Sequence, residues 1–126
     1  MSEIGSIDAI ARALTAGLPA GWREVTAVYR ATAPYAELDA TVDGAQLDPL
    51  PEGLEDSFEI LRQQMYQPGK GAWLTATITV TAAGHFATDF DYDHEPEWSI
   101  AVHAGIYAAD LAEFPRDAQY VPDWLR

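Results

Sequence analysis

The chain lacks cysteine altogether and is short of basic residues. Without cysteine it can form no disulfide, no thiolate metal site and no cysteine nucleophile. Lysine and arginine together number 7 against 20 aspartates and glutamates, which gives a formal net charge of −13 at pH 7. Such a charge repels phosphate backbones and anionic lipid and attracts basic proteins, so direct binding to nucleic acid or to membranes is disfavoured.

Long hydrophobic runs are also missing. No apolar run reaches the ~20 residues that a membrane-spanning helix needs, and the first residues lack the basic and apolar regions of a secretory signal. We therefore expect a soluble, cytoplasmic protein. The 126 residues, of which 48% are hydrophobic, suffice for one core, and we expect residues 1–126 to form a single domain.

Three segments have apolar residues at the three- and four-residue spacing of a helix. The first extends over residues 4–18, the second over residues 54–65, and the third follows Pro96 and ends at Pro115. The apolar stripe of the first segment consists of Ile4, Ile7, Ala11, Leu14 and Leu18.

Four other segments alternate apolar and polar residues, which is the pattern of half-buried strands. They cover residues 22–31, 35–43, 73–81 and 85–93, and short turns join them into two hairpins. The sequence therefore predicts an α+β domain of element order α-β-β-α-β-β-α. In this domain an antiparallel sheet of about four strands has helices packed on one face.

This architecture leaves the second face of the sheet open. If Phe86, Phe90 and Tyr92 lie on the core face of the last strand, the alternating residues lie on the open face. The carboxylates predicted to project from the open face are Glu24, Glu37, Asp39, Asp43, Asp89, Asp91 and Asp93. The same phase predicts that Tyr35, Trp73 and also Trp22 accompany them, and aromatic rings among carboxylates are typical of binding surfaces.

The stretch HFATDFDYDHEPEW concentrates these acidic residues, so a metal site and a catalytic pair have to be considered. Asp89, Asp91 and Asp93 match the first three ligands of an EF-hand loop, but a histidine and an isoleucine occupy the positions that require glycine and glutamate. Successive carboxylates on one face of a strand are also roughly 7 Å apart, too far to share an ion closely. Catalysis by paired carboxylates needs burial or a close like charge, which exposed strand residues lack.

The alternative nevertheless stays open that the chain is a metal-binding module or a metal-dependent hydrolase using Asp89, Asp91 and Asp93 with His85 or His94. It predicts that a metal ion raises the melting temperature. An adaptor that binds several partners is a third hypothesis. The sequence contains no nucleophile elbow, P-loop or dinucleotide-binding glycine motif. We therefore expect no enzyme activity, no catalytic residue, no cofactor and no bound metal.

Four stretches of the chain carry a resemblance to a known family. They are Gly21-Trp22, the helix end LRQQMYQPGKG, the run GAWLTATITVTAAGHFATDFDYDHEPEW and the closing FPRDAQYVPDWL. Together they touch most of the chain, and they resemble the YezG/EsaG-type bacterial immunity proteins. In the long run a tryptophan opens a strand, a glycine turn follows, and a phenylalanine-containing strand ends in D-F-D-Y-D.

The resemblance implies an acidic cytoplasmic antitoxin that binds the toxic C-terminal domain of a secreted polymorphic toxin, often a nuclease. A nuclease holds phosphates in a basic cleft, and an acidic partner can place carboxylates there or on an adjacent surface. We expect a one-to-one complex that uses the open sheet face and the residues that follow it. The predicted toxin contacts are Glu37, Asp39, Asp89, Asp91, Asp93, Glu95, Glu97 and Trp98, with the tryptophan as an aromatic anchor.

Overall fold

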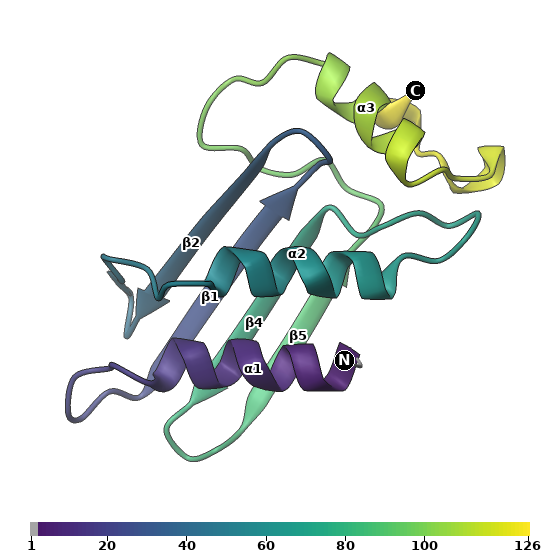
Figure 1. Ribbon diagram of the computed structural model, residues 1–126. Helices are drawn as coiled ribbons and strands as arrows, with labels where there is room; N and C mark the ends of the chain where they lie inside the picture. Colours follow the sequence, from purple (N-terminus) through teal and green to yellow (C-terminus); the bar gives the residue numbers. More distant parts are fainter. Residues whose placement is uncertain (1–2) are drawn as a thin grey trace.

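The computed structural model describes residues 3–126 and has an α+β fold (Figure 1). Within these residues, five antiparallel strands form one sheet in the order β3-β2-β1-β4-β5. The strands are β1 (Glu24–Ala31), β2 (Ala36–Val42), β3 (Ala45–Gln46), β4 (Thr75–Thr81) and β5 (Phe86–Asp91), and the helices are α1 (Glu3–Thr15), α2 (Leu54–Met65) and α3 (Gly105–Glu113). The predicted fold class is confirmed, and the additional strand is β3, which at two residues is too short to show an alternating pattern.

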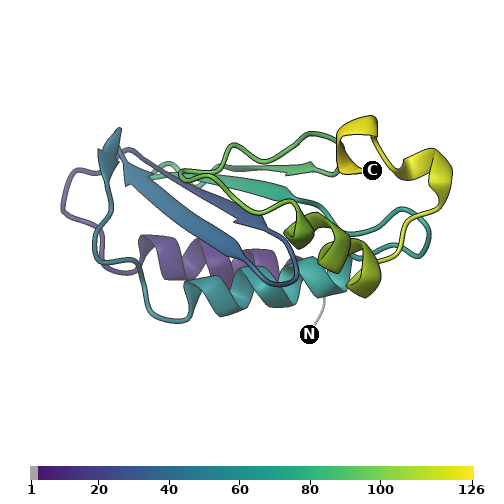
Figure 2. The ribbon, with the colours of Figure 1, turned by 90° about the horizontal axis from the view of Figure 1, so that it is seen from above.

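Helices α1 and α2 cover one face of the sheet and leave the other face open (Figure 2). Strand β1 lies in the middle of the sheet, and its Val25, Ala27, Tyr29 and Ala31 are buried under the helices as the alternation predicts. From α2, Phe58 packs into the same core. Burying the apolar face of an antiparallel sheet under helices is what stabilises this two-layer arrangement.

The predicted stripe of α1 is confirmed for Leu14, which is buried, and for Ile7, Ala11 and Leu18, which pack against the core, but its centre lies elsewhere. Ser6, Ile10 and Leu14 face the core, whereas Ile4 is 76% exposed. A row of positions four residues apart lies along one side of a helix, and in α1 that row passes through Ile10 rather than Ile4. The helix also ends at Thr15, earlier than predicted.

Aromatic rings form the centre of the core. The ring of Tyr29 is stacked on Phe58 at a centroid distance of 5.2 Å and meets Trp73 edge-on at 6.1 Å. Trp73 also contacts Phe90 of β5 at 5.8 Å. The prediction that Trp73 and Trp22 lie on the open face is therefore wrong, since Trp73 is fully buried and Trp22 packs against the same core.

The position of Trp73 has a backbone cause. Thr75 is paired with Asp91, and the N–H of Leu74 also donates to the carbonyl oxygen of Asp91 at 2.8 Å. Leu74 and Thr75 thus both oppose Asp91 of β5, which is the arrangement of a β-bulge. A bulge shifts the alternation by one position, and Trp73 consequently enters the core.

Helix α3 lies beyond the end of the sheet rather than on the face that α1 and α2 cover (Figure 1). The chain then continues through two short 3-10 helices, Ala118–Tyr120 and Asp123–Leu125, and the indole of Trp124 donates to the carbonyl oxygen of Asp93 at 2.7 Å. We call residues 105–126 the C-terminal arm. None of the helices within residues 3–126 is long and apolar enough to cross a membrane.

Candidate functional site

The side chains on the open face of the sheet, most of them polar, lie in rows that run across the strands. The first row is Glu37, Arg30, Thr75 and Asp91, and the second row is Asp39, Val28, Thr77 and Asp89. Each row has a carboxylate on β2 and another on β5, with a threonine of β4 between them. The predicted phase of β2 and β5 is therefore correct, and the acidic residues lie along the two sides of the face.

Residues 94–99, which we call the strap, follow β5 in the chain and cross one end of this face to reach β2, where Ser99 is bound by Glu37. The strap is fastened to β5 by Asp91, whose carboxylate accepts hydrogen bonds from the backbone N–H groups of Asp93 and His94, both at 3.0 Å. The imidazole Nδ1 of His94 lies 3.0 Å from the same carboxylate. Partial burial acts to raise the pKa of Asp91, but these hydrogen bonds outweigh it and hold the pKa below its ordinary value.

Glu37 fastens the other end of the strap to β2. Its carboxylate accepts hydrogen bonds from the N–H of Ser99 at 2.9 Å, from the Ser99 hydroxyl at 2.8 Å and from the Tyr35 hydroxyl at 2.7 Å. Partial burial acts to raise the pKa of Glu37, but the hydrogen bonds and the nearby Arg30 lower it below its ordinary value. The strap is thus held at both ends by carboxylates that favour the ionised form.

The middle of the strap is attached to α3. The indole N–H of Trp98 donates to the Tyr107 hydroxyl at 3.0 Å, and that hydroxyl donates to Glu95 at 2.6 Å. The ring of Trp98 also packs on Tyr35 at a centroid distance of 5.3 Å. Burial, and then the bond to Glu95, raise the pKa of Tyr107. Trp98 is therefore committed in part to holding the strap.

Between the strap and the open face lies an open hollow of about 680 Å³. It is lined by Val28, Arg30, Thr75, Thr77, Asp89, Asp91, His94, Glu95 and Glu97. The guanidinium of Arg30 is paired with Asp39 at 2.9 Å and lies 3.9 Å from Glu37. Because these two carboxylates compensate Arg30, the four carboxylates of the lining give the hollow a negative potential.

Only four of the eight predicted contact residues line the hollow. The structure brings Asp89, Asp91, Glu95 and Glu97 together around the hollow. Strand β5 ends at Asp91, so Asp93 does not extend its row as predicted but lies in the following turn and lines another hollow of about 300 Å³ beside Lys70. Glu37, Asp39 and Trp98 lie at the β2 side, each with a partner inside the chain.

Two of the carboxylates that line the hollow are exposed and have no partner within the described residues. Within residues 3–126 the side chains of Asp89 and Glu97 make no hydrogen bond or ion pair, and both line the hollow. Carboxylates without internal partners are the ones that an incoming cation can bind without first breaking an internal contact. Asp89 and Glu97 are therefore the most direct reporters of binding at the hollow.

The metal alternative involves the same segment. Asp91 uses its oxygens for two backbone N–H groups and the ring of His94, as described above. Over residues 3–126, no group of three or more histidine, aspartate or glutamate side chains has an arrangement that could hold a metal ion.

An apolar hollow of about 230 Å³ lies beside the far end of the strap. Its lining consists of Tyr35, Ile100, Ala101, Val102, His103 and Ile106. Ile100 is 59% exposed. This segment has no recognisable pattern in the sequence, and its position is set by Ser99, which is bound to β2, and by Gly105, where α3 begins.

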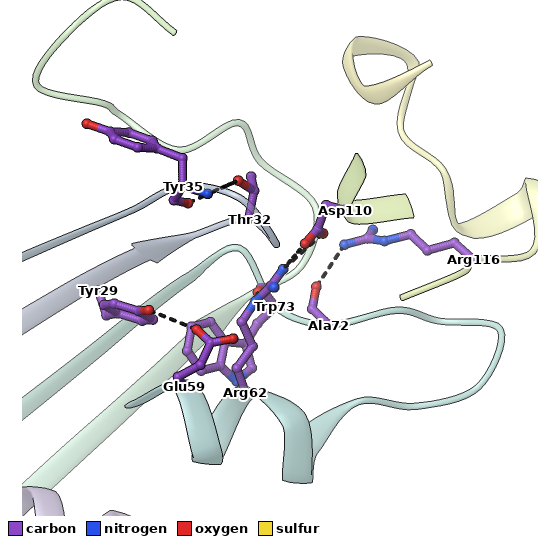
Figure 3. Close-up of polar contacts among 9 residues, drawn as sticks. All are labelled: Tyr29, Thr32, Tyr35, Glu59, Arg62, Ala72, Trp73, Asp110 and Arg116. Carbon is purple, nitrogen blue, oxygen red and sulfur yellow. Dashed lines mark hydrogen bonds and ion pairs between the residues drawn. The ribbon is translucent and has the colours of Figure 1, made fainter. Parts of the chain in front are cut away.

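A buried ion pair that the sequence did not predict joins α2 to α3, the helix to which the strap is attached (Figure 3). Arg62 of α2 is fully buried, contacts Asp110 of α3 at 2.9 Å and donates from Nε to the Trp73 carbonyl oxygen at 2.8 Å. Burial raises the pKa of Asp110, although Arg62 opposes that shift. Arg62 lies four residues after Phe58, on the buried side of α2, and that spacing is the signal that could have revealed it.

Comparison with known proteins gives no assignment. No protein-family model matches the chain, and no curated protein matches it either. The open face, the strap and the hollow are therefore the features of the molecule that bear on its function.

Proposed function

We propose that the protein is an immunity protein that binds the toxic domain of a polymorphic toxin and neutralises it. The binding surface is the open face of the sheet with its acidic hollow, and the partner surface is basic. A toxin that cleaves nucleic acid has such a surface, because its cleft must hold phosphates. Neutralisation requires binding alone and no turnover by this chain.

The observation that carries the proposal is the walled acidic hollow. The strap holds Glu95 and Glu97 opposite Asp89 and Asp91, so carboxylates approach the hollow from two sides. Because the strap is fixed by hydrogen bonds at both ends, the backbone that carries these groups is positioned before a partner arrives. Preorganised carboxylates lose little conformational entropy on binding, which favours tight association with cations of complementary geometry.

The apolar hollow beside the strap supports the same proposal. A protein interface combines an apolar centre, which is dehydrated on binding, with a polar rim. Ile100 and its neighbours supply exposed apolar surface next to the acidic groups. A lysine or arginine of the partner can therefore enter the acidic hollow while an adjacent apolar side chain contacts Ile100.

The experiment begins with tagged protein recovered from the producing cell, followed by mass spectrometry. We expect one large secreted protein, whose C-terminal domain is then expressed with and without this chain. Co-expression should restore growth, and the purified proteins should form a one-to-one complex. If the domain remains fully toxic despite stable expression of this chain, the proposed function is wrong.

Charge reversal then tests the placement of the surface. The double variant Asp89→Lys with Glu97→Lys changes two carboxylates that have no internal partner, so the fold should be retained. We expect it to weaken toxin binding by about 100-fold, as loss of close charge pairs at an interface does. The matched control is Glu52→Lys with Glu113→Lys, which alters the net charge equally at exposed positions outside the hollow.

A further inference from the structure

We infer that the outer edge of β5 is a strand-pairing site, at which a basic β-strand of the partner adds to the sheet. The inference rests on the proposed function, since it specifies how the toxin domain docks. It also identifies main-chain groups, and not only carboxylates, as determinants of binding. Strand addition is a recurring mode of recognition in which the main chain supplies affinity and alternate side chains supply specificity.

The backbone of β5 has free hydrogen-bonding groups on its outer side. His85 and Asp91 direct their carbonyl oxygens toward β4, where they accept from Thr81 and Leu74, both at 2.8 Å. Hydrogen-bonded positions alternate along an antiparallel ladder. The N–H and C=O groups of Phe86, Thr88 and Phe90 therefore point away from β4, and within residues 3–126 none of them has a backbone partner.

The edge is open to a partner. In the sheet order, β5 is terminal and has β4 as its only neighbour among the described strands (Figure 1). The opposite edge of the sheet is partly covered, because Leu47 after β3 donates to the Ala40 carbonyl oxygen of β2 at 2.8 Å. Residues 86–89 are exposed, and Phe86, on the helix side of the sheet, is 57% exposed.

The side chains of β5 define the chemistry of the added strand. Asp89 and Asp91 project from the open face, while Phe86 and Thr88 project from the opposite face. Residues directly opposite each other on paired strands have Cβ atoms about 5 Å apart, and opposite charges at that distance are stabilising. The matching strand therefore alternates lysine or arginine on one face with apolar residues on the other.

A second copy of this chain fits the edge poorly. Antiparallel pairing of two β5 strands about an axis normal to the sheet would put the Asp89 and Asp91 carboxylates of both copies on one face. Like charges on neighbouring strands are destabilising. Each copy also carries a net charge of −13, which adds long-range repulsion. The charge of the edge thus selects a basic partner strand over self-association.

The probe for this inference is the peptide acetyl-VKVKVKVK-amide, with a control peptide of the same sequence in which every backbone nitrogen is methylated. Both peptides carry the same charge, but the control has no backbone N–H to donate. We expect the first peptide to slow amide hydrogen exchange at Phe86, Thr88 and Phe90, as measured by nuclear magnetic resonance. The methylated peptide should leave exchange at these three amides unchanged.

Variants at Thr88 separate main-chain pairing from charge. In Thr88→Pro the outward N–H is lost while the ladder to β4 is retained, because proline is tolerated on an edge strand whose N–H faces solvent. We expect the peptide to bind this variant about tenfold more weakly than the wild type, which corresponds to loss of one main-chain hydrogen bond and local crowding. Thr88→Val keeps the N–H and should bind like the wild type.

The two proposals fail in different ways. If both peptides bind equally, or if Thr88→Pro binds the peptide and neutralises the toxin domain as well as Thr88→Val does, charge alone acts and the edge inference is wrong. The immunity function would then still stand. If the peptide pairs with β5 but no toxin domain is neutralised, the edge site stands and the proposed function is wrong.

Discussion

The carboxylate of Glu37 on β2 accepts hydrogen bonds from both the backbone N–H and the hydroxyl of Ser99, at 2.9 and 2.8 Å, across 62 positions of sequence. This contact closes the strap over the open face. It also separates two hollows of opposite character, the acidic one lined by Glu97 and the apolar one lined by Ile100. The shape of the proposed binding surface therefore depends on one carboxylate that is not itself free to bind.

Glu37→Gln should loosen the strap. The amide keeps the size of the side chain but cannot accept every hydrogen bond that the carboxylate accepts, and we expect a loss of about 1–2 kcal/mol in the free energy of unfolding. The measurement is urea denaturation at pH 7. Asp89→Gln, which changes a carboxylate without internal partners, serves as the control and should leave the stability within about 0.5 kcal/mol of the wild type.

The difference in stability between the wild type and Glu37→Gln should depend on pH. The pKa of Glu37 in the folded protein lies below its ordinary value, so its contribution to stability is present above about pH 4.3 and is lost as the pH falls through the lowered pKa. Stability curves of the wild type and Glu37→Gln should therefore converge below about pH 4. A difference that stays constant down to pH 2 would contradict the role assigned to the ionised carboxylate.

Asp91→Asn should release the strap at its β5 end. The asparagine oxygen can still accept from one backbone N–H, but the charge that strengthens the bonds from Asp93 and His94 is lost. We expect amide hydrogen exchange at these two residues to accelerate about tenfold, which corresponds to about 1.4 kcal/mol. Asp89→Asn, two residues away on the same face, should leave their exchange rates unchanged.

Arg62→Met should be the most destabilising single substitution among those considered. It leaves Asp110 buried without its counter-charge, and removal of one member of a buried ion pair costs about 3–5 kcal/mol. The double variant Arg62→Met with Asp110→Leu removes both charges and should recover much of that loss. Denaturant titrations of the three proteins measure the coupling, and equal stability of the single and double variants would contradict it.

Arg62→Met should also fall behind the wild type as the pH rises, but through a carboxyl whose pKa is shifted in the opposite direction to that of Glu37. Burial raises the pKa of Asp110, and the substitution removes the opposing effect of Arg62. A group whose pKa is raised on folding contributes stability below its unfolded value of about 3.9, and this stability is lost as the pH rises through the folded value. Arg62→Met should therefore be closest to the wild type near pH 4 and fall further behind it toward pH 7.

Association with the toxin domain should depend on salt. Because the hollow is lined by carboxylates, steering should raise the association rate constant at low ionic strength. We expect it to fall by about tenfold as salt rises from about 0.05 to about 0.5 M, since the Debye length shortens over that range. Stopped-flow mixing measures the rate, and Asp89→Lys with Glu97→Lys should show a shallower dependence than the control reversal at Glu52 and Glu113.

Alternation predicted β1, β2, β4 and β5, and it predicted the face on which the side chains of β1, β2 and β5 lie, because these three strands follow it without interruption. It misplaced Trp73, because a bulge opposite Asp91 shifts the pattern, and a bulge is a pairing between two segments that neither segment reveals alone. Strand β3 was missed because its two residues pair only where the preceding hairpin places them. Local patterns therefore predicted the elements but not their irregularities.

The site was predicted in the same limited way. Exposure of Asp89 and Glu97 follows from local position, and the sequence placed both in the candidate surface. The internal roles of Glu37, Glu95 and Trp98 depend on Ser99 and Tyr107, which fold onto them from elsewhere in the chain. Only the tertiary structure shows which carboxylates are already engaged and which stay available.

The Arg62–Asp110 contact also constrains the order of folding. The guanidinium belongs to the helix that closes the core, yet its counter-charge follows 48 residues later in the C-terminal arm. A chain that has formed the sheet and α2 without the arm would enclose an uncompensated cation, which is strongly unfavourable. The domain should therefore complete its core and dock its arm in one cooperative transition, so that a shortened chain lacking the arm accumulates as an incompletely packed species rather than as a smaller native protein.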